Sequence, residues 1–110
     1  MNKRSVIFMS FPNDVVKLVE TIYQGGLYAY NKNTEKTIYI CTPHKFSGKT
    51  YAFDIGHLSD NLNKSIVELF DVPILTVEEN HLSLGEINGY NFFMGELTER
   101  MKKDWLRIKT

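Results

Sequence analysis

The stretch that decides the fold is HLSLGEINGYNFFM, residues 81–94. Asn88-Gly89 lies near its centre, and Asn-Gly is a strong signal for a two-residue hairpin turn because both turn positions need a positive φ. Apolar residues alternate with others on either side of this pair, as they do in half-buried strands. The segment therefore predicts strands over 81–87 and 90–94 that pair as an antiparallel hairpin.

More strands are predicted before this hairpin. Runs of apolar, β-branched and aromatic residues bounded by turn residues predict strands, and they occupy 4–11, 27–31, 37–42, 50–55 and 74–77. The polar connection over 32–36 has the length of a hairpin loop, and 43–49 is interpreted as a second loop. Residues 27–55 are therefore expected to form an antiparallel meander.

Three amphipathic helices are predicted between and after these strands. Apolar residues recur at helical spacing over 14–24, over the segment that precedes Pro73, and over 97–108. Asn13 or Asp14 is expected to cap the first helix, and Ser59 or Asp60 the second. The apolar stripe of the last helix contains Trp105, which is expected to pack against the sheet.

These elements alternate in the order β-α-β-β-β-α-β-β-β-α. The order predicts an α+β fold, in which an antiparallel or mixed sheet of about five to six strands carries helices mainly on one face. The chain has 110 residues, the length of one domain. No linker or repeat divides it, so residues 1–110 are expected to form a single domain.

Composition and charge narrow the class of protein. There are 13 Lys or Arg and 13 Asp or Glu, which gives a formal net charge of zero and makes nucleic acid an unlikely partner. The single cysteine, Cys41, excludes an intrachain disulfide and favours a reducing compartment. The longest apolar run, over 6–9, is far too short for a membrane span, and no signal peptide is recognisable. A cytoplasmic protein without a membrane partner is expected.

Motifs for nucleotides, metals and thiol catalysis are incomplete. Gly48-Lys49-Thr50 is similar to the end of a phosphate-binding loop, but Pro43 stands where the first glycine is needed. No two histidines are four residues apart, so no helix presents a zinc pair. Cys41 needs a neighbouring histidine to act as a nucleophile, and free cysteines are usually buried. The sequence predicts no metal and no cofactor.

One alternative function is a small ribonuclease or toxin. Such an enzyme needs a general base, a general acid and a cation for the phosphate. His44 and His57, together with Lys45 or Lys49, are residues of these types around one predicted hairpin. Their spacing is not diagnostic of catalysis.

Charge is distributed unevenly along the second half of the chain. Residues 65–99 contain no Lys or Arg, whereas five basic residues follow between 100 and 109. The acids of this stretch are Glu68, Asp71, Glu78, Glu79, Glu86, Glu96 and Glu99. A negative field of this kind steers a basic partner and rejects others.

The leading hypothesis is a small non-catalytic binding protein of the inhibitor or immunity type, which caps a basic toxin or nuclease. The expected contact residues flank two turns and are Glu78, Glu79, Glu86 and Tyr90. Tyrosines on the open face of the sheet would add aromatic contacts, and the candidates are Tyr28, Tyr30, Tyr39 and Tyr51. A further alternative is a homodimer in which the acidic and basic stretches meet across a two-fold axis.

Overall fold

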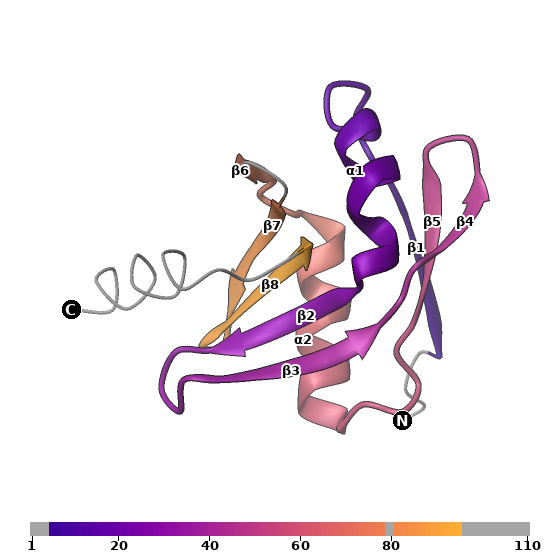
Figure 1. Cartoon of the computed structure of the whole chain (residues 1–110). Helices are drawn as coiled ribbons and strands as arrows, with labels where there is room; N and C mark the ends of the chain where they lie inside the picture. The colour runs from indigo at the N-terminus through magenta and orange to yellow at the C-terminus, as the bar shows by residue number, and fades with distance from the viewer. Residues whose placement is uncertain (1–4, 79–80, 96–110) are drawn as a thin grey trace.

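Eight strands and two α-helices make up residues 5–78 and 81–95, the part of the chain that this computed structural model describes (Figure 1). The elements are β1 (Val6–Ser10), α1 (Val16–Ile22), a short 3-10 helix η1 (Tyr23–Gly25), β2 (Leu27–Asn31), β3 (Lys36–Cys41), β4 (His44–Ser47), β5 (Thr50–Asp54), α2 (Asp60–Asp71), β6 (Thr76–Glu78), β7 (His81–Ile87) and β8 (Tyr90–Gly95). The α+β fold class is confirmed.

The strands divide between two antiparallel sheets. The larger sheet has five strands in the order β3-β2-β8-β7-β6, and the smaller has three in the order β1-β5-β4. The expected meander over 27–55 is therefore wrong, because β5 pairs with β1 and β4 and not with β3. Pro43, which has no N–H to donate to a ladder, follows the end of β3, and the chain crosses there to the smaller sheet.

The hairpin that ends the described chain follows its prediction closely. Ile87 and Tyr90 pair across the turn, and the φ angles of Asn88 and Gly89 are 53° and 83°. Two positive φ values are what a type I′ turn requires. The predicted C-terminal helix with Trp105 falls within 96–110, and that range lies outside the described residues.

The two α-helices begin differently. Ser59 caps α2, since its Oγ accepts a hydrogen bond of 3.3 Å from the N–H of Leu62, as predicted. In α1 the N-cap is Val15 and no side chain caps the helix, so the cap expected from Asn13 or Asp14 is wrong. The C-terminal end of α1 continues into η1, and Gly26, which follows η1, takes a positive φ.

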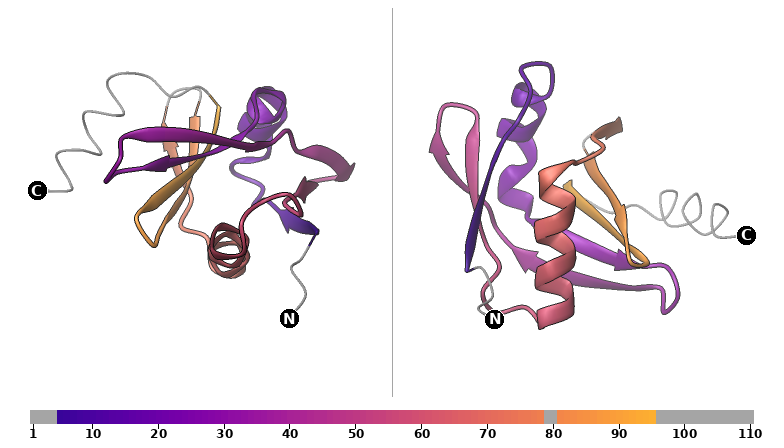
Figure 2. Two further views of the ribbon diagram at one scale, coloured as in Figure 1. Left: turned by 90° about the horizontal axis from the view of Figure 1, so that it is seen from below. Right: turned by 180° about the vertical axis from the view of Figure 1, so that it is seen from behind.

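One core joins the two sheets and both helices. The inner face of the smaller sheet contributes Ile7, Met9 and Phe53, while the larger sheet contributes Leu82 and Phe92. The helices lie between these layers, and α2 lies beside β1 at the border between the two sheets (Figure 2). No helix within 5–78 and 81–95 is long and apolar enough to cross a membrane.

Candidate functional site

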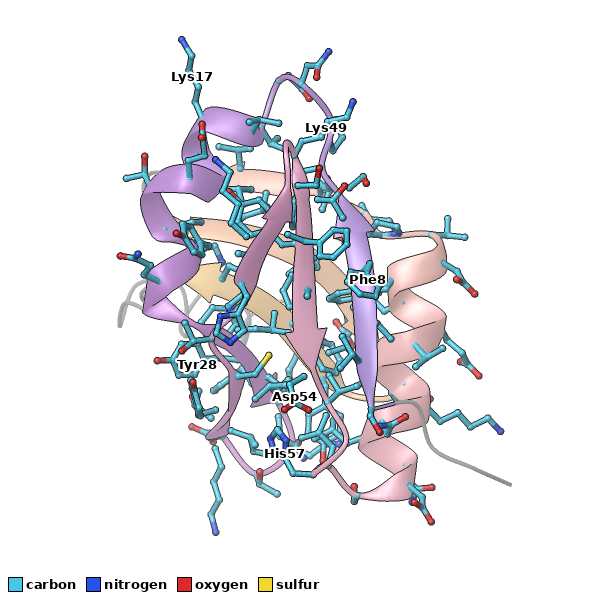
Figure 3. All side chains as sticks on the ribbon, turned by 90° about the vertical axis from the view of Figure 1, so that its right-hand side faces the viewer. Phe8, Lys17, Tyr28, Lys49, Asp54 and His57 are labelled. Atoms are coloured by element: carbon cyan, nitrogen blue, oxygen red, sulfur yellow. The ribbon has the colours of Figure 1, made fainter. Side chains whose placement is uncertain are left out.

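The smaller sheet has one buried face and one open face. Along β1 exposure alternates strictly, with Ile7 and Met9 buried and Val6, Phe8 and Ser10 exposed. Because directly paired residues of an antiparallel sheet lie on the same face, the register places Ala52 and His44 in one row with Phe8. Figure 3 looks onto this open face, and no described helix or strand lies over it.

Strand β4 adds a second aromatic residue to the open face. Lys45 is paired with Tyr51 on the opposite side of the sheet from the open face, and its exposed Nζ lies 2.9 Å from Oε2 of Glu20 in α1. Ser47 pairs with Thr50, which leaves Phe46 as the extra residue of a β-bulge. A bulge re-aims a side chain at a sheet edge, and here Phe46 lies with its ring against that of Phe8.

The two phenylalanine rings meet above the central strand. Their centroids are 4.9 Å apart at an interplanar angle of 60°, although β1 and β4 are two strand spacings apart. The methyl side chain of Ala52 lies between the two strands and leaves room for both rings. Phe8 is 55% and Phe46 66% exposed. We name this surface the aromatic face, and its members are Val6, Phe8, His44, Phe46 and Ala52.

The aromatic face ends in groups of opposite charge. Lys49 lies at the end where β4 turns into β5, whereas Asp54 lies at the other end (Figure 3). Asp54 pairs with Val6 and is exposed, and its Oδ1 accepts a hydrogen bond from the N–H of Gly56. Between these ends the face carries no carboxylate or ammonium group. An uncharged centre with polar ends is typical of a protein contact surface.

The residues expected to bind a basic partner lie at two places along β7. Glu86 and Tyr90 flank the β7–β8 turn, whereas Glu78 pairs with His81 at the opposite end of β7. At about 3.3 Å per residue the two ends are roughly 17 Å apart. Glu79 lies outside the described residues. The sequence-based contact set therefore forms two separate positions rather than one cluster.

Two members of that set already have contacts within the chain. Oε1 of Glu86 lies 2.9 Å from Nζ of Lys32, so its charge is compensated. Tyr90 is partly buried and packs against the main core, with its ring 6.1 Å from that of Phe92. Glu86 is exposed and paired with Lys32, whereas Tyr90 is partly buried, and the contact hypothesis for the acidic stretch stays a prediction.

Of the four tyrosines expected to supply exposed aromatic contacts, one is exposed. Tyr30 and Tyr51 are buried and Tyr28 is half-buried, which leaves Tyr39 exposed among the four. The hydroxyl of Tyr39 lies 2.6 Å from the Oγ1 of Thr42. The exposed aromatic pair instead consists of phenylalanines, and sequence reasoning missed it because 43–49 was interpreted as a loop.

The structure separates the residues proposed for a ribonuclease. Lys49 and His57 flank the two ends of β5 (Figure 3), and a five-residue strand is roughly 17 Å long. Lys45 is bound to Glu20, and this hydrogen bond raises the pKa of its ammonium group. His44 pairs with Ala52 in the aromatic face. Nε2 of His57 lies 2.8 Å from the carbonyl oxygen of Ile40, which assigns that nitrogen the proton.

Cys41 lacks the chemistry of a nucleophile. Its side chain is buried, and burial raises the pKa of the thiol to about 11. A thiolate is the reactive form, and reactive cysteines have a lowered pKa. Cys41 is therefore a packing residue, as the more ordinary interpretation predicted.

A concave region lies between α2 and the β7–β8 turn. Its volume is about 620 Å³, and its lining consists of Ser59, Asn61, Leu62, Lys64, Ser65, Glu68, Asn88 and Tyr90. Asn88 donates a hydrogen bond of 2.8 Å to Ser65, which in turn donates to the carbonyl of Asn61. Over the described ranges no group of three His, Cys, Asp or Glu side chains could hold a metal ion.

No protein-family model, curated protein or solved structure matches this chain. The aromatic face is therefore selected as the candidate site on geometry and exposure alone.

Proposed function

We propose that this chain is a small non-catalytic protein-binding module and that the aromatic face is its contact surface. The observation that carries the proposal is the pair Phe8 and Phe46, which are 55% and 66% exposed on a sheet face that no described element covers. Large aromatic side chains that are buried at the centre of a contact dominate its binding energy. Burial of each ring by a partner would contribute about 1.5–3 kcal/mol.

The pattern of β1 supports the same proposal. Its residues Val6 to Met9 are apolar on both faces of the strand. A strand with one solvated face usually alternates apolar with polar residues, whereas strands covered on both faces are continuously apolar. Strand β1 therefore has the sequence of a strand whose outer face is also covered.

The chemistry of the face restricts the partner. A charge buried against Phe8, Phe46 and Ala52 would find no counter-charge, and an unpaired buried charge is costly. The partner is therefore a protein whose contact surface has an apolar centre. The inhibitor hypothesis places a second contact on the acidic stretch, and its partner is basic.

Affinity capture with matched variants tests the proposal. The bait proteins are the wild type, a Phe8→Ser/Phe46→Ser variant and a control with Val72→Ser/Ile74→Ser. The control removes two side chains that are 77% and 71% exposed on the α2–β6 connection. We expect the wild type and the control to bind the same partner, and the aromatic-face variant to lose it by at least tenfold in a direct binding measurement with the purified partner.

Two further outcomes discriminate between contact surfaces. A partner that binds the aromatic-face variant as tightly as the wild type would overturn the proposal. A partner lost only on Glu78→Lys/Glu79→Lys would instead support the acidic surface. Circular dichroism of every variant verifies that the fold is retained.

A further inference from the structure

We propose that the occupant of the aromatic face is the same face of a second copy of this chain. This inference rests on the proposed function, because it names the partner of the same surface. The two copies would be related by a two-fold axis that lies in the contact plane between the two sheets. This axis is perpendicular to the strands and passes above Ala52. In such an isologous contact both copies use the same surface, and a residue that contacts a second residue of the partner copy is matched by the reverse contact.

The two end rows of side chains on the face are complementary under that rotation, which superimposes the middle row of Phe8, Ala52 and His44 on itself. The bulky Val6 lies in the row of Asp54, whereas small hydroxyl side chains of Ser10, Thr50 and Ser47 form the row at the opposite end. The rotation exchanges the two ends, so that Val6 of one copy faces the small row of the other. Sheets that pack face to face interdigitate side chains in this way.

Charge complementarity selects the same orientation. The rotation brings Asp54 of each copy towards the end that carries Lys49 of the other (Figure 3). A parallel arrangement would instead bring Lys49 towards Lys49 and Asp54 towards Asp54. The formal net charge of the chain is zero, so no net repulsion opposes the approach of two copies.

The size of the face limits how tightly two copies can bind. Three strands about 4.8 Å apart and roughly 17 Å long give a footprint of about 240 Å². Stable complexes bury about 800 Å² of accessible surface on each partner. A face this small therefore predicts weak association at most, which is measured over about 10 µM to 1 mM protein.

A charge exchange between two variants tests the pairing. In Lys49→Asp and in Asp54→Lys each homodimer would bring like charges together twice. A mixture of the two variants would bring opposite charges together twice. Sedimentation velocity is expected to show at least tenfold weaker self-association for each variant alone than for the wild type, and restored association in the equimolar mixture.

A matched pair on α2 controls for the altered net charge. Lys64→Asp and Glu68→Lys change the net charge by the same amounts at exposed positions away from the face. They are expected to associate as the wild type does, alone and mixed. Asp54→Asn retains the acceptor for the N–H of Gly56 and removes the charge, so its weaker association would exclude a broken turn as the cause.

A wild type that stays monomeric throughout the concentration range would overturn the inference. The same holds if the equimolar mixture of Lys49→Asp and Asp54→Lys associates no more tightly than either variant alone. The proposed function would survive this result if Phe8→Ser/Phe46→Ser still abolished capture of another protein. If the Phe8→Ser/Phe46→Ser variant retained both self-association and capture, the further inference and the proposed function would both be overturned.

Discussion

At position 52 the side chain is a single methyl group, and this small size lets Phe8 and Phe46 meet across three strands. The bulge at Phe46 and the alternation of β1 aim the two rings at the same side of the sheet. At the residue scale the candidate site thus depends on the small side chain of Ala52 and on the β-bulge at Phe46. For two other residues, Cys41 and His57, experiments can distinguish a structural role from a catalytic one.

Alkylation of Cys41 is predicted to be slow in the folded protein. Burial raises its pKa from 9.0, the value of an unperturbed cysteine thiol, to about 11. At pH 7.5 the folded protein therefore holds roughly two orders of magnitude less thiolate than the unfolded chain. Iodoacetamide labelling with and without urea should differ by about that factor, and the folded rate should rise tenfold per pH unit up to pH 9.5. Equal rates in both states would contradict the buried assignment.

The substitution His57→Ala is predicted to lower the free energy of unfolding and to have no effect on any RNA-cleaving activity. The imidazole bonds to the carbonyl oxygen of Ile40 at 2.8 Å, and loss of such a bond costs about 0.5–1.5 kcal/mol. Urea unfolding measures this change, with the exposed His44→Ala as the matched control near zero. An RNA-cleaving activity of the purified wild type that His57→Ala removed without unfolding would favour the ribonuclease alternative.

At the scale of elements, the sequence predicted the features that a few neighbouring residues determine. Ser59 caps α2, and Asn88-Gly89 turns β7 into β8, because the cap and the turn are each decided within four residues. Strand β4 was missed because all of its residues are exposed and burial imposes no alternation on them. The division into two sheets depends on pairings between distant strands, and no local pattern encodes it.

The aromatic face was missed for related reasons. Phe8 was recognised as a strand residue, but β1 is apolar on both faces and its alternation could not indicate which side is exposed. Phe46 stood in a segment interpreted as a loop. The continuous apolar character of β1 was the one signal that could have suggested a second covered face.

The β7–β8 turn carries a prediction at this scale. Gly89 has a φ of 83°, and a Cβ there would meet its nearest neighbouring atom, Nδ2 of Asn33, only at 3.4 Å. The cost of Gly89→Val is therefore conformational, about 1–3 kcal/mol of unfolding free energy. Gly25→Ala is the matched control, because its φ is not positive and the nearest atom is 3.9 Å away. Similar melting temperatures for the two variants would contradict the type I′ assignment.

At the scale of the whole molecule, two sheets of unequal size share one core. The inner face of the smaller sheet completes that core, and α2 lies beside its β1 edge (Figure 2). The outer face of the smaller sheet is the surface through which β1, β5 and β4 together can contact a partner.

Photocrosslinking from Phe46 in the living host tests the central claim most directly. The photoreactive amino acid p-benzoylphenylalanine is placed at Phe46 in one strain and at Val72 in a control strain, since both side chains are well exposed. Illumination followed by denaturing electrophoresis and mass spectrometry identifies the protein attached at each position. The proposed contact predicts a discrete product from position 46, either with another protein or with a second copy, and none from position 72. The same product from both positions, or a product from position 72 alone, would contradict it.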